Sequence, residues 1–156
     1  MHRKIFIALG IVSGLILSMA LMMEFVFHQQ ACKLCYLQRI PYFLILVSSL
    51  YGLYSKRPLI VLRIIQGILT VGFLIASYHS AIIFGIVDDP CLLKPRPHDL
   101  QSFKALMEAP LPCSASTWQI FDMPISVLNA IFSVFLIASI QRALKQEDKV
   151  QFLNPQ

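Results

Sequence analysis

Charged residues are scarce in this chain of 156 residues, where Asp, Glu, Lys and Arg together make up only 13%. Ordinary soluble domains carry about 25%, so too few polar side chains are present to cover a water-exposed surface. Hydrophobic residues account for 57% of the chain, and its mean hydropathy is +0.70. The scarcity of charge excludes an ordinary soluble domain and predicts that the bilayer is the solvent.

The formal net charge of +5 does not indicate a nucleic-acid-binding protein. The Lys and Arg residues occur in short groups beside apolar runs, and they form no stripe that could follow a phosphate backbone. That placement is typical of membrane orientation signals. We therefore expect the lipid bilayer, and no nucleic acid, among the partners.

Four segments are long and apolar enough to cross the bilayer, which takes about 20 helical residues. The first contains the uncharged run Ile5–Met23. The loop SKRP at 55–58 is so short that the second and third segments should form an antiparallel hairpin. The predicted spans are about 5–27, 36–54, 64–87 and 123–140. The sequence thus predicts an all-α integral membrane protein, a four-transmembrane-helix bundle that forms a single membrane domain over residues 1–156.

The distribution of Lys and Arg favours cytoplasmic placement of both termini. Eight basic residues then lie inside and five outside: Arg3, Lys4, Lys56, Arg57, Arg63, Arg142, Lys145 and Lys149 against Lys33, Arg39, Lys94, Arg96 and Lys104. A cleaved signal peptide is the alternative for the first segment, and it too would leave the following residues outside the cytoplasm. The outer loops are then predicted at about 28–35 and 88–122.

The second outer loop contains a candidate amphipathic helix at residues 99–109. Four apolar side chains recur there at helical spacing: Leu100, Phe103, Leu106 and Met107. We expect a short helix lying on the outer membrane surface; the alternative is a small helix folded over the loops of the bundle. Trp118, further along the loop, is expected to anchor the chain at the membrane interface.

All four cysteines fall in the predicted outer loops: Cys32, Cys35, Cys91 and Cys113. Disulfides persist on the oxidising side of a membrane, so this layout indicates a redox or disulfide system. Cys91 and Cys113 either staple the loop that they bracket or take part in thiol–disulfide exchange. Four cysteines allow three pairings, and the sequence does not choose among them.

The C-x-x-C pair, Cys32 and Cys35, has several common uses. Zinc would need further ligands, for which His28 and His98 are candidates without fixed geometry, so we expect no metal. Attachment of haem needs a histidine after the second cysteine, where Tyr36 stands instead. A staple closing so small a loop would add little stability. A redox pair fits better, because a helix N-terminus lowers the pKa of a thiol.

Two further residues are candidates for the site. Arg39 lies one helical turn after Cys35 on the same face and can stabilise a thiolate or another anion; the alternative is snorkelling to the headgroups. His79 lies within the third span, where a histidine is costly and indicates a site; the alternative is a hydrogen bond to a neighbouring backbone. Pro41 disfavours helical geometry at Ile40, so a kink in the second span is expected to weaken the alignment.

The string C-x-L-C-x-x-Q-R-x-P-Y, here Cys32–Tyr42, resembles the first outer loop of the bacterial disulfide-bond formation protein B (DsbB) family. The likeness continues in order with SYHS in the third span, PC opening the second outer loop, a further cysteine, and W-x-x-F-x-M-P…N-A at the start of the fourth span. It extends over essentially the whole chain, and the cysteine layout is its most specific part.

The resemblance implies an enzyme of the bacterial inner membrane. It would reoxidise a periplasmic thioredoxin-like dithiol oxidase (DsbA) and pass the electrons to a membrane quinone, either ubiquinone or menaquinone. Arg39 would hold the quinone oxygen, and His79 would lie near the quinone. The rival interpretation is a non-enzymatic membrane scaffold with two structural disulfides in its outer loops.

The resemblance also implies an order of reaction for the four cysteines. The thiolate of the partner would attack Cys91, and Cys113 would then attack Cys32. Cys35 would be released as the thiolate that meets the quinone ring. This order makes Cys32, Cys35, Cys91 and Cys113 the predicted catalytic residues.

Overall fold

The structure is a computed structural model that describes residues 2–28, 31–90, 113, 119–120 and 123–153. In this part of the chain four helices are long and apolar enough to cross a bilayer. They are α1 (His2–Phe25), α2 (Lys33–Tyr54), α3 (Pro58–Ile83) and α5 (Ile125–Leu153), the last over its segment Ile125–Gln146. The predicted four-span helical membrane protein is confirmed. The interfacial helix expected at 99–109 and the anchor Trp118 lie outside the described residues.

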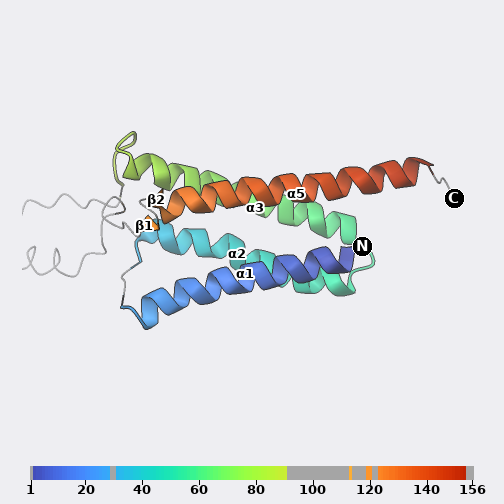
Figure 1. Cartoon of the computed structure of the whole chain (residues 1–156), viewed down its shortest axis with the longest axis horizontal. Coiled ribbons are helices and arrows are strands. Elements are labelled where there is room, and N and C mark those ends of the chain that lie inside the picture. Colours follow the sequence, from blue (N-terminus) through green and yellow to red (C-terminus); the bar gives the residue numbers. More distant parts are fainter. Residues whose placement is uncertain (1, 29–30, 91–112, 114–118, 121–122, 154–156) are drawn as a thin grey trace, which may run out of the picture.

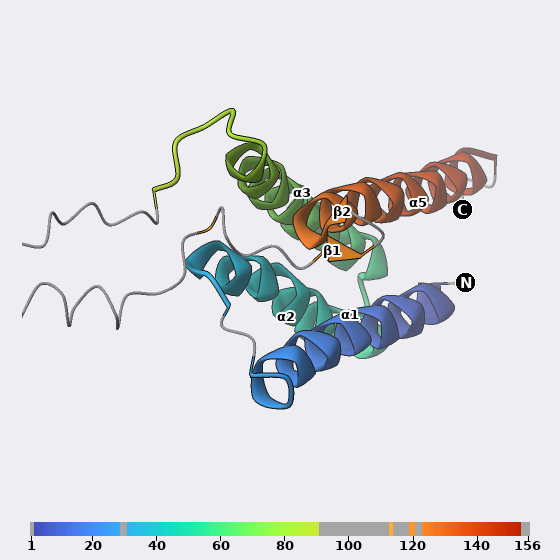
Figure 2. The same ribbon diagram turned by 60° about the vertical axis from the view of Figure 1, so that its left-hand side comes forward.

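The helices pack in chain order, α1 on α2, α2 on α3 and α3 on α5 (Figure 1). A second view, turned by 60°, shows the same neighbours, so these helices lie side by side (Figure 2). The start of α1 and the end of α5 lie at the end of the bundle where α2 turns into α3 (Figure 1). The opposite end collects the α1–α2 connection, the end of α3 and the start of α5.

Helix α3 ends at Ile83, whereas the predicted span ran to Val87. Gly85 adopts a left-handed φ of 70° just after the helix, and glycine takes this conformation without the steric cost of a Cβ. The backbone N–H of Ile86 turns back to the Ala81 carbonyl at 2.9 Å. Gly85 is therefore a C-terminal stop signal, and the last turns of α3, with His79, lie at the end of the bundle opposite the α2–α3 connection.

The interior of the bundle is filled by apolar side chains from all four helices. The largest cluster of buried residues is Phe6, Leu9, Tyr42, Ile45, Val61, Leu62, Ile65, Leu69 and Ile140. Many other large apolar side chains, such as Leu15 on α1 and Phe135 on α5, are exposed. A bilayer explains this pattern, since lipid-facing helix surfaces need no polar cover.

Pro41 lies inside α2, and the helix is continuous from Lys33 to Tyr54 around it. The proline packs against α3 at Gly72, where an added Cβ would lie 3.2 Å from the Cβ of Pro41. A glycine allows this close approach because it presents no side chain. The close contact holds α2 and α3 together two turns below the cysteine pair.

A two-stranded hairpin precedes the last helix and was not predicted. Strand β1 (Gln119–Ile120) pairs antiparallel with β2 (Met123–Pro124), Gln119 opposite Pro124 and Ile120 opposite Met123. Helix α5 then begins at Ile125, directly after Pro124. The hairpin thus leads directly into α5.

Gly52 is a site where the packing of α1 on α2 can be tested. A Cβ added there would overlap the ring of Phe6, a residue buried in the main cluster. We expect Gly52→Ala to lower the free energy of unfolding by about 1–3 kcal/mol, because the ring must leave its site. Unfolding of the purified protein by denaturing detergent, followed by circular dichroism, measures this change.

Gly67→Ala is the matched control for Gly52→Ala, because nothing lies within 4 Å of a Cβ added at Gly67. Alanine is a better helix former than glycine, so this variant should be as stable as the parent or slightly more stable. Equal stability of the two variants would contradict the described packing of α1 on α2.

Candidate functional site

The two cysteines of the C-x-x-C pair lie at the start of α2. Cys32 is the N-cap residue, with extended backbone angles, and its sulfur accepts a hydrogen bond from the backbone N–H of Cys35 at 3.3 Å. The two sulfurs lie 2.8 Å apart. Cys32 is fully buried and Cys35 is half-buried. The N-cap position therefore gives Cys32 the hydrogen-bond donor and positive end of the helix that stabilise a thiolate.

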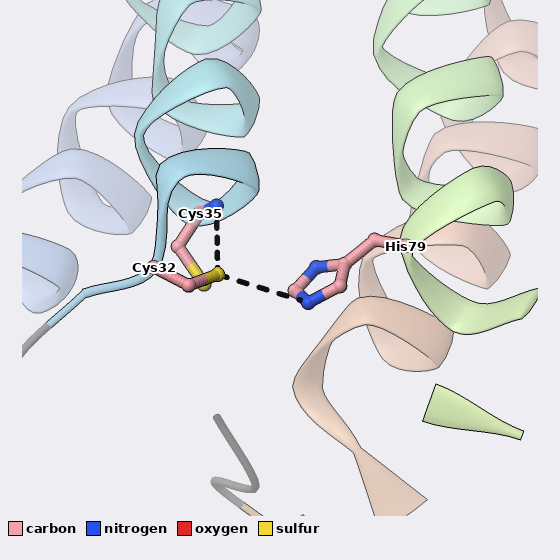
Figure 3. A group of neighbouring side chains, drawn as sticks. All are labelled: Cys32, Cys35 and His79. Atoms are coloured by element: carbon pink, nitrogen blue, oxygen red, sulfur yellow. Dashed lines mark hydrogen bonds between the residues drawn. The ribbon is translucent and has the colours of Figure 1, made fainter. Parts of the chain in front are cut away.

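His79 approaches this pair from the last turns of α3. Its ring is only 3% exposed, and Nε2 lies 3.8 Å from the Cys32 sulfur. Figure 3 shows the ring reaching across from α3 toward the start of α2. Nε2 also lies 3.3 Å from the backbone carbonyl oxygen of Cys113. His79 thus joins the first turn of α2 to the backbone at Cys113.

A chain of buried polar side chains holds the other nitrogen of His79. The Gln38 amide lies 3.2 Å from Nδ1, and its Oε1 accepts a hydrogen bond from Asn129 on α5 at 3.3 Å. The Tyr42 hydroxyl donates in turn to Asn129 Oδ1. We call Tyr42, Asn129 and Gln38 the amide chain. It links α2, α3 and α5 in the apolar interior, where each hydrogen bond avoids a buried unpaired polar group.

The amide chain sets which nitrogen of the His79 ring carries the hydrogen. With Gln38 accepting through Oε1 from Asn129, its Nε2 must donate to His79 Nδ1. The Cys113 carbonyl can only accept, so Nε2 must carry a hydrogen. This assignment follows from the pattern of donors and acceptors. The result is a ring whose Nε2–H points to the Cys113 carbonyl and lies beside the Cys32 sulfur.

Cys113 is placed next to the C-x-x-C pair. It is fully buried in a small cluster with Cys32, Leu34 and Ile82, and Cys35 packs against this cluster. Cys113 is disulfide-bonded. Cys91 lies outside the described residues. The structure therefore brings Cys32, Cys35, Cys113 and His79 together.

Arg39 points toward α1 and forms an ion pair with Glu24 near its end. The guanidinium also lies over the ring of Tyr36, 4.7 Å from its centroid, and 3.5 Å from the Ala20 carbonyl. The Tyr36 hydroxyl donates to the same Glu24 carboxylate. The side chain of Arg39 keeps 19% of its surface exposed. Its described contacts tie the end of α1 to the start of α2.

The sequence did not identify four polar residues that the structure places at or beside the site. They are Glu24, Gln38, Tyr42 and Asn129. A polar residue inside an apolar span is a signal for Gln38 and Asn129, because its burial in lipid requires a partner. Glu24 and Arg39 carry opposite charges near the ends of two consecutive spans. This arrangement is the signal from which their ion pair could have been predicted.

Three potential metal ligands meet at this site. The sulfurs of Cys32 and Cys35 and a ring nitrogen of His79 all lie within 4.8 Å of one another. His28, considered earlier as a ligand, is exposed and has a positive φ of 52° in the connection after α1, while His98 lies outside the described residues. The same three side chains can therefore act as a redox site or as soft metal ligands.

Comparison with known proteins places these features in one family. A family model described as "Disulfide bond formation protein DsbB" matches residues 2–141. The match includes all four cysteines, the amide chain and His79. No curated protein and no solved structure matches the chain.

Proposed function

The chain belongs to the DsbB family of disulfide bond formation proteins, and on this premise we propose that it oxidises a periplasmic thioredoxin-fold dithiol oxidase of the DsbA type and passes the electrons to a membrane quinone. Family membership confirms the resemblance drawn from the sequence. Together with the four apolar helices, it makes the chain a multi-pass inner-membrane thiol oxidoreductase. The observation that carries the finer proposal is the burial of Cys32 and Cys113 in one cluster, with half-buried Cys35 packed against it.

The two proposed reactants, a soluble dithiol protein and a lipid-soluble quinone, occupy different solvents. A soluble dithiol protein cannot enter hydrocarbon, and a prenylated quinone cannot leave it. A linking protein therefore needs thiols at the outer interface and a sulfur that can be reached from the lipid side. Cys32 and Cys113, both 0% exposed, fit the exchange steps within the protein. Half-buried Cys35 fits the step that is reached from the lipid side.

The exchange steps follow from disulfide chemistry. The thiolate of the partner attacks Cys91 of a Cys91–Cys113 disulfide and releases the Cys113 thiolate. Cys113 then attacks Cys32 of a Cys32–Cys35 disulfide and releases the Cys35 thiolate. Each step exchanges one S–S bond for another and moves no electrons out of the thiols. The second thiolate of the partner then attacks the mixed disulfide, which closes the partner's own disulfide and releases the Cys91 thiolate. Cys91 attacks Cys113 of the Cys113–Cys32 disulfide, which re-forms the loop disulfide and releases the Cys32 thiolate. Two electrons and two protons leave the chain when Cys32 and Cys35 then form their disulfide again, and a bound quinone would supply the chemistry of accepting them.

The site supplies hydrogen-bond donors for negative charge on Cys32. The backbone N–H of Cys35 points at the Cys32 sulfur from the first turn of α2, and His79 Nε2–H lies beside it. These groups are fixed before the reaction, so they stabilise a thiolate without reorganisation. We propose that His79 acts in this way next to the reacting pair. The nearness of the pair also supports the position near the quinone that the family resemblance implies for His79.

Cys35 and its surroundings fit a quinone that approaches from the lipid. Helix α2 presents exposed apolar side chains at Tyr36, Leu37 and Ile40, directly after the half-buried Cys35. Arg39 lies among them, and its remaining N–H groups can hydrogen-bond to a quinone oxygen. Glu24 already pairs with this guanidinium, so we propose that Glu24 fixes its direction.

The chain is proposed to sit with both termini in the cytoplasm. The start of α1 and the end of α5 lie at one end of the bundle, and the C-x-x-C pair lies at the other (Figure 1). The excess of Lys and Arg at the termini and in the α2–α3 connection supports a cytoplasmic location for that end. The cysteines then face the oxidising periplasm.

Cys35→Ser tests the proposed function against the rival scaffold with two structural disulfides. We expect the rate of quinone reduction by a reduced DsbA-type partner to fall by at least about 10³-fold, because no Cys32–Cys35 disulfide can form. The assay follows quinone absorbance with protein in lipid nanodiscs, and helical content by circular dichroism checks folding. A folded variant with full turnover would refute the relay and leave the scaffold.

Arg39→Ala tests the proposed quinone contact. We expect the quinone KM to rise about tenfold, which corresponds to the loss of one charge-assisted hydrogen bond of about 1.4 kcal/mol. Arg63→Ala is the matched control, since Arg63 is exposed on α3 toward the opposite end of the bundle. An Arg39→Ala variant with the KM of the control would show that Arg39 serves only the ion pair with Glu24.

Cys113→Ala tests the order of the two cysteine pairs. Without Cys113, Cys91 has no loop disulfide for the partner to attack. Cys91 of the variant is therefore first joined to a small thiol in a mixed disulfide. We expect a cysteine-variant partner lacking its second thiol to stay bound to Cys91, because no Cys113 thiolate can carry the exchange to Cys32. Peptide mapping by mass spectrometry identifies the joined cysteine. An adduct found only at Cys32 would reverse the proposed order.

A further inference from the structure

A third soft ligand completes a metal-binding set at the C-x-x-C pair. The sequence alone offered two cysteines and no histidine at a fixed position. The fold supplies the missing histidine: His79 on α3 places its Nε2 3.8 Å from the Cys32 sulfur. The three ligand atoms lie within 4.8 Å of one another. Two thiolates and one imidazole, with a further position open to water, are a known donor set for Zn²⁺.

We propose that the reduced Cys32–Cys35 pair and His79 form a Zn²⁺ site that exists only while the disulfide between the two cysteines is open. Binding of the ion displaces two thiol protons and involves no electron transfer, since Zn²⁺ is not redox-active. In the disulfide form neither sulfur is a thiolate, and the donor set is lost. This site rests on the three described side chains and does not depend on the quinone or on the protein partner.

The distances require one small adjustment. Tetrahedral Zn²⁺ with Zn–S near 2.3 Å and Zn–N near 2.0 Å separates neighbouring ligand atoms by about 3.5–3.8 Å. The distance from Cys32 Sγ to His79 Nε2, 3.8 Å, already agrees. The two sulfurs, now 2.8 Å apart, must separate by about 1 Å, which a rotation of the half-buried Cys35 side chain can supply.

The amide chain can adapt to the metal as a unit. An ion on Nε2 requires the hydrogen of the ring to move to Nδ1, and Gln38 must then present its oxygen there. Gln38 and Asn129 can both turn their amides over, and the Tyr42 hydroxyl can accept as well as donate. Every hydrogen bond of the amide chain is therefore kept after the change, and only the contact of Nε2 with the Cys113 carbonyl is given up for the metal. Such a hydrogen bond to the distal ring nitrogen strengthens metal binding.

Zn²⁺ on this site would hold both cysteines as metal-bound thiolates. Neither could then form a disulfide until the ion left. The ion would enter on the side of Cys35, the one ligand of the three that is half-exposed, because Cys32 and His79 are buried. The site would thus make the thiol pair sensitive to free Zn²⁺ only after it has been reduced.

The experiment uses Co²⁺ as a spectroscopic probe and Zn²⁺ as its competitor. The full chain with Cys91→Ser and Cys113→Ser, which keeps only the two thiols of the site, is placed in nanodiscs and reduced with a phosphine. Titration with Co²⁺ should give one ion per chain, with a thiolate-to-cobalt charge-transfer band and the ligand-field bands of tetrahedral cobalt. Zn²⁺ should abolish both, and the oxidised protein should give neither.

Variants identify the third ligand. His79→Ala should weaken Zn²⁺ binding by at least about 100-fold, and Gln38→Leu by about tenfold, since loss of a hydrogen-bonded support costs about 10–100-fold. His79→Cys should restore binding with a stronger thiolate band. His28→Ala is the control, because His28 is an exposed histidine outside the cluster, and its affinity should equal that of the parent.

Three results would overturn the proposal. They are equal binding by the oxidised protein, cobalt spectra without a thiolate band, and an affinity of His79→Ala equal to that of the parent. A second measurement needs no variant: Zn²⁺ should slow alkylation of Cys35 in the reduced natural chain, and an unchanged rate would also overturn it. Neither measurement contains quinone or partner, so failure here leaves the proposed function untouched, and failure of turnover leaves the metal site untouched.

Discussion

The hydrogen bond between the Gln38 amide and Nδ1 of His79 is the contact on which the site depends. It crosses from α2 to α3 between two buried side chains, so its loss would leave the Gln38 amide N–H and His79 Nδ1 unpaired. Asn129 and Tyr42 extend it to α5. Each residue of the amide chain sets which atom of the next residue must donate. As a result, Nε2 of His79 carries its hydrogen on the side of Cys32.

The fold gives the two cysteines of the C-x-x-C pair different degrees of burial, although they are close in sequence. Cys32 is buried as the N-cap of α2, close to Cys113 and His79, while Cys35 is half-buried one turn further on. In the proposed relay, Cys32 exchanges with another disulfide and Cys35 meets a lipid-soluble acceptor. The difference in exposure between these two cysteines, which are three residues apart, is consistent with these two roles.

The positive charge of Arg39 is paired with Glu24, whereas the sequence predicted that it acts directly on Cys35. The spacing of four residues was correct for one face of a helix, and α2 is continuous through Pro41. The guanidinium nevertheless lies against Glu24 and Tyr36. An apolar environment favours this arrangement, because a charge there is costly unless an opposite charge meets it. Any anion bound by Arg39 would share it with the Glu24 carboxylate.

The sequence by itself determined the four spans and the family, because hydropathy, spacing and motif are properties of consecutive residues. It also marked His79 as a costly residue in lipid and Arg39 as a group that can stabilise an anion, without giving their partners. Only the tertiary structure decided those partners: Gln38 and Asn129 are 91 residues apart, and Cys32 and His79 are 47 apart. Such contacts depend on how the helices pack, and the packing is fixed by shape and polar pairing among all of them.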